Sequence, residues 1–209
     1  MSEIGKRITA ITNEGLSPRL KDYGFRKRGV NYCRTDGDSI QVVTVQSSQW
    51  NNADSGRFRV NFGVHYPNVA RLLYESDRMP KFPTESYCIL RAIWSVPDRW
   101  WTVDSTTITA DLAVNLGEYW SETVWPWLEA NKLLSEAATT LERQPMDRMA
   151  AAAARLQLGE HDEAARLIRI CVADFENALQ AQSSHPADAQ RITTHLRVLR
   201  AWAVSHGLL

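Results

Sequence analysis

The stretch that decides the fold is GFRKRGVNYCRTDGDSIQVVTVQSSQWNNADSGRFRVNFGVHYP, residues 24–67. Asp36-Gly37 separates two runs of strand-forming residues and supplies the positive φ that a tight hairpin needs. A second polar loop, residues 51–56, precedes a strictly alternating segment, RFRVNFGVH. Apolar side chains on one face of that segment are Phe58, Val60, Phe62 and Val64. We therefore predict a three-stranded antiparallel meander that begins near Val30.

An amphipathic helix is expected before the meander, over residues 3–23. Apolar residues recur there at roughly helical spacing, and Ser17-Pro18 predicts a bend. Gly24 is expected to end the helix.

Downstream of Pro67, residues 68–78 have helical spacing, and the following MPKFP cannot continue a helix. Residues 87–94 and 100–103 are predicted to be strands, which brings the sheet to about five antiparallel strands. A packing helix is expected over residues 107–134, capped by Ser105 or Thr106 and kinked or restarted at Pro126. The predicted class is therefore α+β.

The composition changes near Gln144-Pro145 to alanine, arginine, leucine and glutamine, with no strand-like segment. We predict an α+β domain over residues 1–144 and an all-helical appendage over residues 145–209. Residues 146–175 resemble one helix-turn-helix unit of the tetratricopeptide type, and a last helix is expected over residues 186–206. Because one repeat unit cannot bury its own faces, the appendage must pack on the α+β part or on another subunit.

Charge and hydropathy restrict the partners. The 24 Lys and Arg residues balance 24 Asp and Glu residues, so no global field attracts polyanions or anionic lipid. Nucleic acid is disfavoured for this reason. The chain has no run of eighteen apolar residues and no signal-peptide pattern at its N-terminus, so we expect a cytoplasmic protein without a membrane partner.

The cysteines and tryptophans are expected to be mainly structural. Cys33, Cys88 and Cys171 fit no metal or disulfide pattern, and the first two are predicted to be small buried hydrophobes. No metal site and no cofactor are predicted. Four tryptophans have spacing suited to packing of a helix on the sheet, namely Trp94, Trp120, Trp125 and Trp127, and most of them are expected in the core.

Several short motifs that follow one another in a fixed order along the chain resemble those of a known protein family. The motifs are Leu20 with Gly24-Phe25, Ile40 to Val43 with Gln46, Ser48 and Trp50, then Phe58, Asn61, Gly63 and Tyr66-Pro67, and finally Arg91, Asp98 to Trp101 and Pro126 to Leu128. Over roughly residues 8–134 the chain resembles domain-of-unknown-function family 4304, whose members are uncharacterised bacterial proteins. A second arginine expected shortly after Arg91 is replaced by apolar residues such as Ile93. The resemblance implies a fold and a bacterial setting, and such families include immunity proteins.

The side of the third strand opposite its apolar stripe is polar, and it is the candidate working surface. Its arginines could bind a carboxylate or phosphate, and a tryptophan could close the site by stacking. The candidate binding residues are Gln46, Ser48, Trp50, Arg57, Arg59, Asn61, His65, Arg91 and Trp101. The alternative is an ordinary solvated sheet face, on which His65 is a satisfied surface histidine. The spacing of these residues indicates no catalytic set.

Two functions are compatible with these observations. The first is a non-catalytic protein-binding module, of the immunity or accessory kind, that engages a protein partner or a second copy of itself. The second is a small-molecule-binding protein or an enzyme centred on the polar sheet face. The second function requires Arg57, Arg59, Asn61, His65 and Arg91 to converge in one pocket.

Overall fold

The computed structural model describes residues 2–74, 80, 82–144, 147–181 and 186–209. The chain forms two compact units. Unit 1 comprises residues 1–67 and 78–132, and unit 2 comprises residues 68–77 and 133–209. The boundary predicted near residue 144 therefore lies within unit 2, after the helix Leu134–Glu142.

Unit 1 contains a six-stranded antiparallel sheet, and the α+β class is confirmed. Its strands are β1 (Arg26–Arg28), β2 (Asn31–Asp36), β3 (Ser39–Ser47), β4 (Ser55–His65), β5 (Leu90–Arg91) and β6 (Trp101–Asp104). β1 to β4 follow one another in the sheet. β5 and β6 both pair with β4, at its two ends: Val64 pairs with Leu90, and Phe58 pairs with Trp101. β4 is therefore the central strand.

The predicted hairpin is confirmed. Asp36 pairs with Ser39 at its end, and Gly37 has φ 57°. The left-handed region favours glycine because glycine has no Cβ. The predicted first strand corresponds to β2, and an additional short strand that was not predicted, β1, precedes it across a turn at Gly29.

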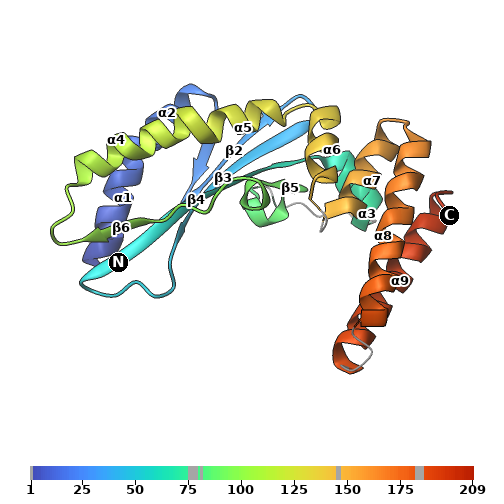
Figure 1. Ribbon diagram of the computed structural model, residues 1–209. Coiled ribbons are helices and arrows are strands. Elements are labelled where there is room, and N and C mark those ends of the chain that lie inside the picture. Colours follow the sequence, from blue (N-terminus) through green and yellow to red (C-terminus); the bar gives the residue numbers. More distant parts are fainter. Residues whose placement is uncertain (1, 75–79, 81, 145–146, 182–185) are drawn as a thin grey trace. The chain divides into compact units, whose positions relative to one another are not determined.

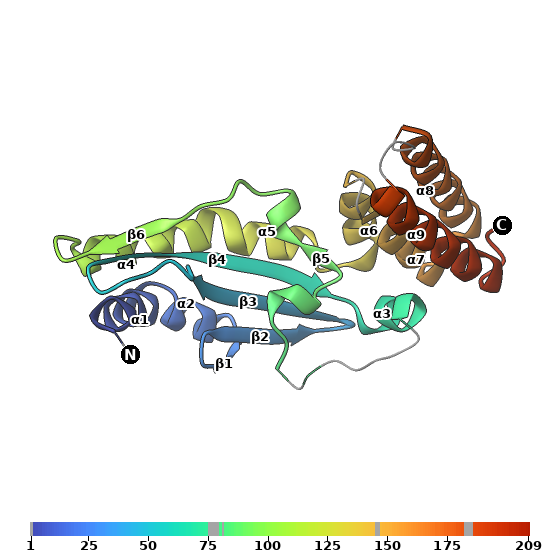
Figure 2. The same cartoon turned by 90° about the horizontal axis from the view of Figure 1, so that it is seen from below.

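Helices cover one face of the sheet (Figures 1 and 2). They are α1 (Glu3–Gly15), α2 (Ser17–Asp22), α4 (Thr109–Tyr119) and α5 (Trp125–Ala130), with a π-helical turn at Trp120–Val124. α1 and α4 approach so closely that a Cβ added to Gly15 of α1 would lie only 2.3 Å from the carbonyl oxygen of Ala113 in α4. The apolar stripe of β4 faces these helices, and Phe62 packs edge-on against Trp127 at 5.3 Å. The core of unit 1 therefore lies between the sheet and this helical layer.

Two helix predictions changed in detail. The N-terminal helix is divided at Leu16, and the predicted bend at Ser17-Pro18 is confirmed. The packing helix begins at Thr109 without a side-chain cap. Pro126 does not break the packing helix, because the π-helical turn precedes it and it occupies the first turn of α5, where its missing N–H is tolerated.

The strand predicted over residues 87–94 is mostly wrong. Only Leu90 and Arg91 pair with β4, between the 3₁₀ turns η1 (Glu85–Tyr87) and η2 (Ala92–Trp94). Most of this segment lies over β3 and β4 instead of extending the sheet: Tyr87 contacts His65, and Cys88 lies against Gly63. Trp94, predicted to be in the core, has 53% of its surface exposed.

Unit 2 is built of helices joined by turns, and its described residues include no strand. Its helices are α3 (Pro67–Tyr74, of which Pro67 belongs to unit 1), α6 (Leu134–Glu142), α7 (Arg148–Gln157), α8 (His161–Ala181) and α9 (Pro186–Ser205). Ala151 to Ala154 are fully buried, and a turn with Gly159 at φ 80° leads from α7 into α8. Trp202 of α9 donates a 2.7 Å hydrogen bond to the Leu72 carbonyl of α3. The helical segment predicted after Pro67 thus joins the C-terminal helices.

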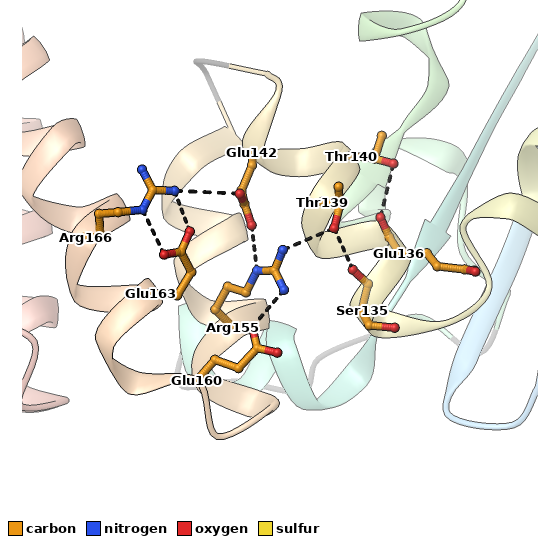
Figure 3. Close-up of polar contacts among 9 residues, drawn as sticks. All are labelled: Ser135, Glu136, Thr139, Thr140, Glu142, Arg155, Glu160, Glu163 and Arg166. Atoms are coloured by element: carbon orange, nitrogen blue, oxygen red, sulfur yellow. Dashed lines mark hydrogen bonds and ion pairs between the residues drawn. The ribbon is translucent and has the colours of Figure 1, made fainter.

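A network of charged side chains holds α6, α7 and the start of α8 together (Figure 3). Arg155, whose side chain is 15% exposed, donates from Nε to Glu142 at 2.6 Å and from Nη1 to Glu160 at 2.7 Å. Its third nitrogen donates to the Thr139 hydroxyl at 3.1 Å. Every nitrogen of this guanidinium therefore has a partner within unit 2.

Among the residues that the structure describes, no helix combines the length and the apolar character needed to cross a lipid bilayer.

Candidate functional site

The face of the sheet opposite the helices is called here the open face (Figure 2). The register places Arg57, Arg59, Asn61, Gly63 and His65 of β4 on this face. Their neighbours in β3 are Gln46, Thr44, Val42 and Ile40, which stand opposite Arg59, Asn61, Gly63 and His65, respectively. The shared orientation expected from the sequence is thus present, and it follows from the two-residue period of antiparallel strands.

One end of the open face is covered by residues 84–89, the covering segment. The Glu85 amide donates to the Thr44 hydroxyl at 3.3 Å, and Nδ1 of His65 lies 2.9 Å from the Tyr87 carbonyl oxygen. A Cβ on Gly63 would lie 2.8 Å from the Cβ of Cys88. Glycine is therefore required at position 63, because the covering segment approaches the strand so closely.

His65 lies beneath the covering segment and is only 4% exposed. The prediction of a surface histidine is wrong, because residues 84–89 bury this end of the face. Burial lowers the pKa of His65, and the hydrogen bond to Tyr87 opposes the effect. His65 is therefore a neutral, packed residue at neutral pH.

Arg91 lies at the covered end as well. It pairs with Gly63 in the sheet, and its guanidinium lies 3.9 Å from the Glu85 carboxylate. Burial raises the pKa of Glu85, while the positive charges of Arg91 and Arg59 oppose the rise. Arg91 is thus engaged by an acid of the covering segment.

Cys88 and Cys33 are buried at the covered end together with Val42, as the sequence predicted. Burial raises the pKa of both thiols, strongly for Cys88. Both therefore remain protonated at neutral pH, the form that is a poor nucleophile.

The other end of the open face lies outside the covering segment. Arg59 donates from Nε to Gln46 at 3.0 Å, and its Nη1 lies 3.2 Å from both carboxylate oxygens of Asp98. Asn61 donates to the same Gln46 oxygen at 2.6 Å. Arg59, Asn61 and Gln46 therefore form one hydrogen-bonded group.

Arg57 is held differently. Its guanidinium lies 5.0 Å from the centre of the Trp100 ring, and the guanidinium of Arg59 lies 4.9 Å from the same ring. The Trp100 indole donates to Asp98 at 2.9 Å, which fixes the ring. We call Arg57, Arg59 and Trp100 the Arg–Trp cluster. Cation–π contacts of this kind hold an arginine in place without neutralising its charge.

Trp50 stands beside the cluster in the loop between β3 and β4, and it is 76% exposed. Asn51 fixes this loop by accepting from the Arg57 amide at 2.8 Å and donating to the Arg57 carbonyl at 3.1 Å. A cavity of about 180 Å³ lies here, lined by Ser48, Trp50, Asn51, Ser55, Gly56, Arg57 and Thr102. Ser48, Trp50 and Arg57 of the predicted set thus meet in one pocket.

Trp101 lies on the other face of the sheet. It is 4% exposed, its ring stacks on Phe58 at 5.5 Å, and its indole donates to Asn115 at 2.9 Å. It therefore cannot close the polar site, and the neighbouring Trp100 lies over the arginines instead. The two-residue period could have identified Trp100, because Thr102 pairs with Arg57 and Trp100 precedes it by two residues.

Glu85 and Asp98 are also absent from the predicted set. Glu85 begins the 3₁₀ turn η1 and Asp98 lies in the loop before β6, and no local pattern specifies the course of either segment. Their proximity to Arg91 and Arg59 depends on how residues 84–100 return to β4.

Apart from Trp101, which lies on the other face of the sheet, the predicted residues divide into two groups. Arg57, Ser48 and Trp50 line the pocket, with Arg59, Asn61 and Gln46 adjoining through the hydrogen-bonded group. His65 and Arg91 are engaged by the covering segment, and neither lines the pocket beside Trp50. The convergence that the enzyme alternative requires is not seen in this pocket.

The Arg–Trp cluster together with the exposed Trp50 can recognise an anion next to an aromatic or apolar group. A guanidinium binds a carboxylate with two parallel hydrogen bonds, and an exposed indole supplies a stacking surface. Within the described ranges, no three His, Cys, Asp or Glu side chains are grouped so that they could hold a metal ion.

Comparison with known proteins agrees with the sequence resemblance. No curated protein and no solved structure matches the chain. A family model described as a domain of unknown function (DUF4304) matches residues 16–130, more than half of the 209 residues. This range contains the whole sheet and the helices from α2 to α5. The chain therefore belongs to the DUF4304 family.

Proposed function

We propose that the chain is a non-catalytic, cytoplasmic bacterial protein-binding module, of the immunity or accessory kind, whose contact surface is the Arg–Trp cluster with Trp50. The observation that carries the proposal is the 76% exposure of Trp50 beside the exposed Arg57, in a loop fixed by Asn51. Tryptophan and arginine are enriched among the residues that dominate binding energy at protein interfaces. A fixed loop favours binding because little conformational entropy is lost when the partner docks.

The size of the pocket beside Trp50 favours a protein partner over a small molecule. Its volume is about 180 Å³. Pockets that enclose small ligands are usually about 300 to 1,000 Å³. A cavity of the smaller size suits one side chain that projects from a partner surface.

A quantitative pull-down tests the proposal. The tagged full chain is expressed in the source bacterium, and the proteins recovered with wild type, Trp50→Ala and Trp94→Ala are compared by mass spectrometry. Trp94 is the matched control, because it is an exposed tryptophan of unit 1 outside the Arg–Trp cluster. We expect a partner in stoichiometric amount with wild type and Trp94→Ala. We expect its affinity for Trp50→Ala to fall about 30-fold, the equivalent of the roughly 2 kcal/mol typical of a dominant interface residue.

Two outcomes would contradict the proposal. One is the recovery of no stoichiometric partner, together with a monomeric chain in sedimentation experiments. The other is equal recovery with wild type and Trp50→Ala.

The small-molecule alternative has its own test. A ligand present at one hundred times its dissociation constant stabilises the protein by about 2.7 kcal/mol. Thermal shifts across a metabolite panel that disappear in Arg57→Ala would favour that alternative.

A further inference from the structure

We propose that the partner segment that docks on the Arg–Trp cluster is acidic, and that one of its carboxylates binds the guanidinium of Arg57. This inference rests on the proposed function and adds the chemistry of the partner.

The open face carries an excess of arginine although the whole chain is neutral. Arginines at open-face positions of the strands are Arg26, Arg28, Arg57, Arg59 and Arg91. The acid at such a position is Asp104, which pairs with Ser55 and accepts hydrogen bonds from Thr106 and Thr107. A partner with the opposite charge therefore fits this face.

Arg57 is the cluster arginine that is ready to bind an anion. Arg59 already contacts Asp98, and Arg91 lies beside Glu85. Within the described part of the chain, no carboxylate lies within ion-pair distance of Arg57. Its contact with Trp100 fixes the guanidinium plane but leaves the charge uncompensated. An incoming carboxylate would therefore find a cation that is oriented and unpaired.

The surroundings of Arg57 favour a carboxylate on a protein over nucleic acid. A nucleic-acid backbone needs a row of unpaired cations along its phosphates. Here the next arginine on the strand, Arg59, is already paired with Asp98. The adjoining pocket offers the hydroxyls of Ser48, Ser55 and Thr102 and the ring of Trp50 to the residue next to the acid.

Crosslinking followed by binding measurements tests the inference. In the full chain, the photoreactive residue p-benzoylphenylalanine replaces Gln49, which is exposed and adjacent to Trp50 without lining the pocket. After irradiation of the source cells, the crosslinked segment is identified by mass spectrometry. We expect a protein segment that contains Asp or Glu within a few residues of the crosslink.

The identified partner is then purified and titrated against four variants. We expect Arg57→Ala to weaken binding at least 10-fold, Arg57→Glu to weaken it further and Arg57→Lys to retain part of the affinity. The matched control is Arg169→Glu, which makes the same charge change at an exposed position of α8. It should bind like wild type. The salt dependence of binding should be weaker in Arg57→Ala than in wild type.

The outcomes separate the two proposals. A crosslinked segment without acidic residues, a crosslink to nucleic acid, or unchanged affinity of Arg57→Glu would overturn the acidic-partner inference. A protein contact that still depends on Trp50 would leave the proposed function intact. The absence of any crosslinked protein would overturn both.

Discussion

The two ends of the open face differ in what lies over them. At one end the covering segment buries His65 and touches the backbone of Gly63. At the other end Arg57 and Trp50 are exposed, and the polar side chains are ordered by their own contacts. The same strand, β4, supplies both ends. The polar side of a single strand can thus be divided by one covering segment into a structural part and a part available for recognition.

The largest expected effect is at the covered end, in the variant Gly63→Ala. The added Cβ would lie 2.6 Å from the Leu90 carbonyl oxygen and 2.8 Å from the Cβ of Cys88. Because the nearer atom belongs to the backbone of β5, and the other to the covering segment, both must shift away from β4. We expect a loss of about 1 to 3 kcal/mol in the free energy of unfolding. Urea denaturation would measure the change.

Ser55→Ala is the control on the same strand, because Ser55 lies at the exposed end of β4. Its unfolding free energy should stay within about 0.5 kcal/mol of wild type. Equal stability of Gly63→Ala and Ser55→Ala would contradict the division of the face into two ends.

A smaller effect is expected from the titration of His65. Burial lowers its pKa below the ordinary value of 6.5, so protons bind more readily to the unfolded chain. The resulting stability is present above about pH 6.5 and is lost as the pH falls through the folded-state pKa. We expect wild type to lose more unfolding free energy than His65→Asn between pH 7.5 and pH 5.

Urea denaturation at several pH values would give the slope of the unfolding free energy against pH for wild type and for His65→Asn. The contributions of the other histidines cancel, because both proteins contain them. Identical slopes would mean that His65 titrates normally and that the covering segment does not exclude water from it.

The ion pair between Arg59 and Asp98 should contribute still less to stability. The two side chains are 18% and 51% exposed, and exposed pairs are usually worth less than about 1 kcal/mol. A double-mutant cycle with Arg59→Ala and Asp98→Ala should therefore give a coupling energy below that value. A larger coupling would show that this end of the face is also mainly structural.

The smallest stability effect is expected for Arg57→Ala. Its guanidinium is exposed and contacts Trp100 through its π face. Thermal denaturation should show a change within about 0.5 kcal/mol, although binding of the proposed partner should weaken at least 10-fold. A variant that unfolds much more easily than wild type would show that Arg57 supports the fold.

Local patterns predicted a large part of unit 1. The alternation from Phe58 to Val64 and the turn at Gly37 specified β2, β3 and β4, because sheet periodicity and positive φ leave few alternatives. The same patterns failed over residues 87–94. Cys88 and its neighbours are suited to a strand, but contact with Gly63 holds them across the sheet.

The candidate site was predictable to a similar degree. Strand parity placed Arg57, Arg59, Asn61 and Gln46 together, and the structure agrees. Strand parity could not show that His65 is buried. It also could not show that the tryptophan in contact with the arginines is Trp100 instead of Trp101. These facts depend on residues 84–100, whose path is set by contacts between positions distant in the sequence.

The amino-acid sequence by itself determined the α+β class, the central meander, the family and the polar side of β4. It could do so because the period of a strand and the conformation of a turn are local properties of the chain. Only the tertiary structure decided which part of that polar side is exposed. Burial by the covering segment and the stacking of Arg57 on Trp100 are long-range contacts, and they separate a packed histidine from an arginine that remains available to a partner.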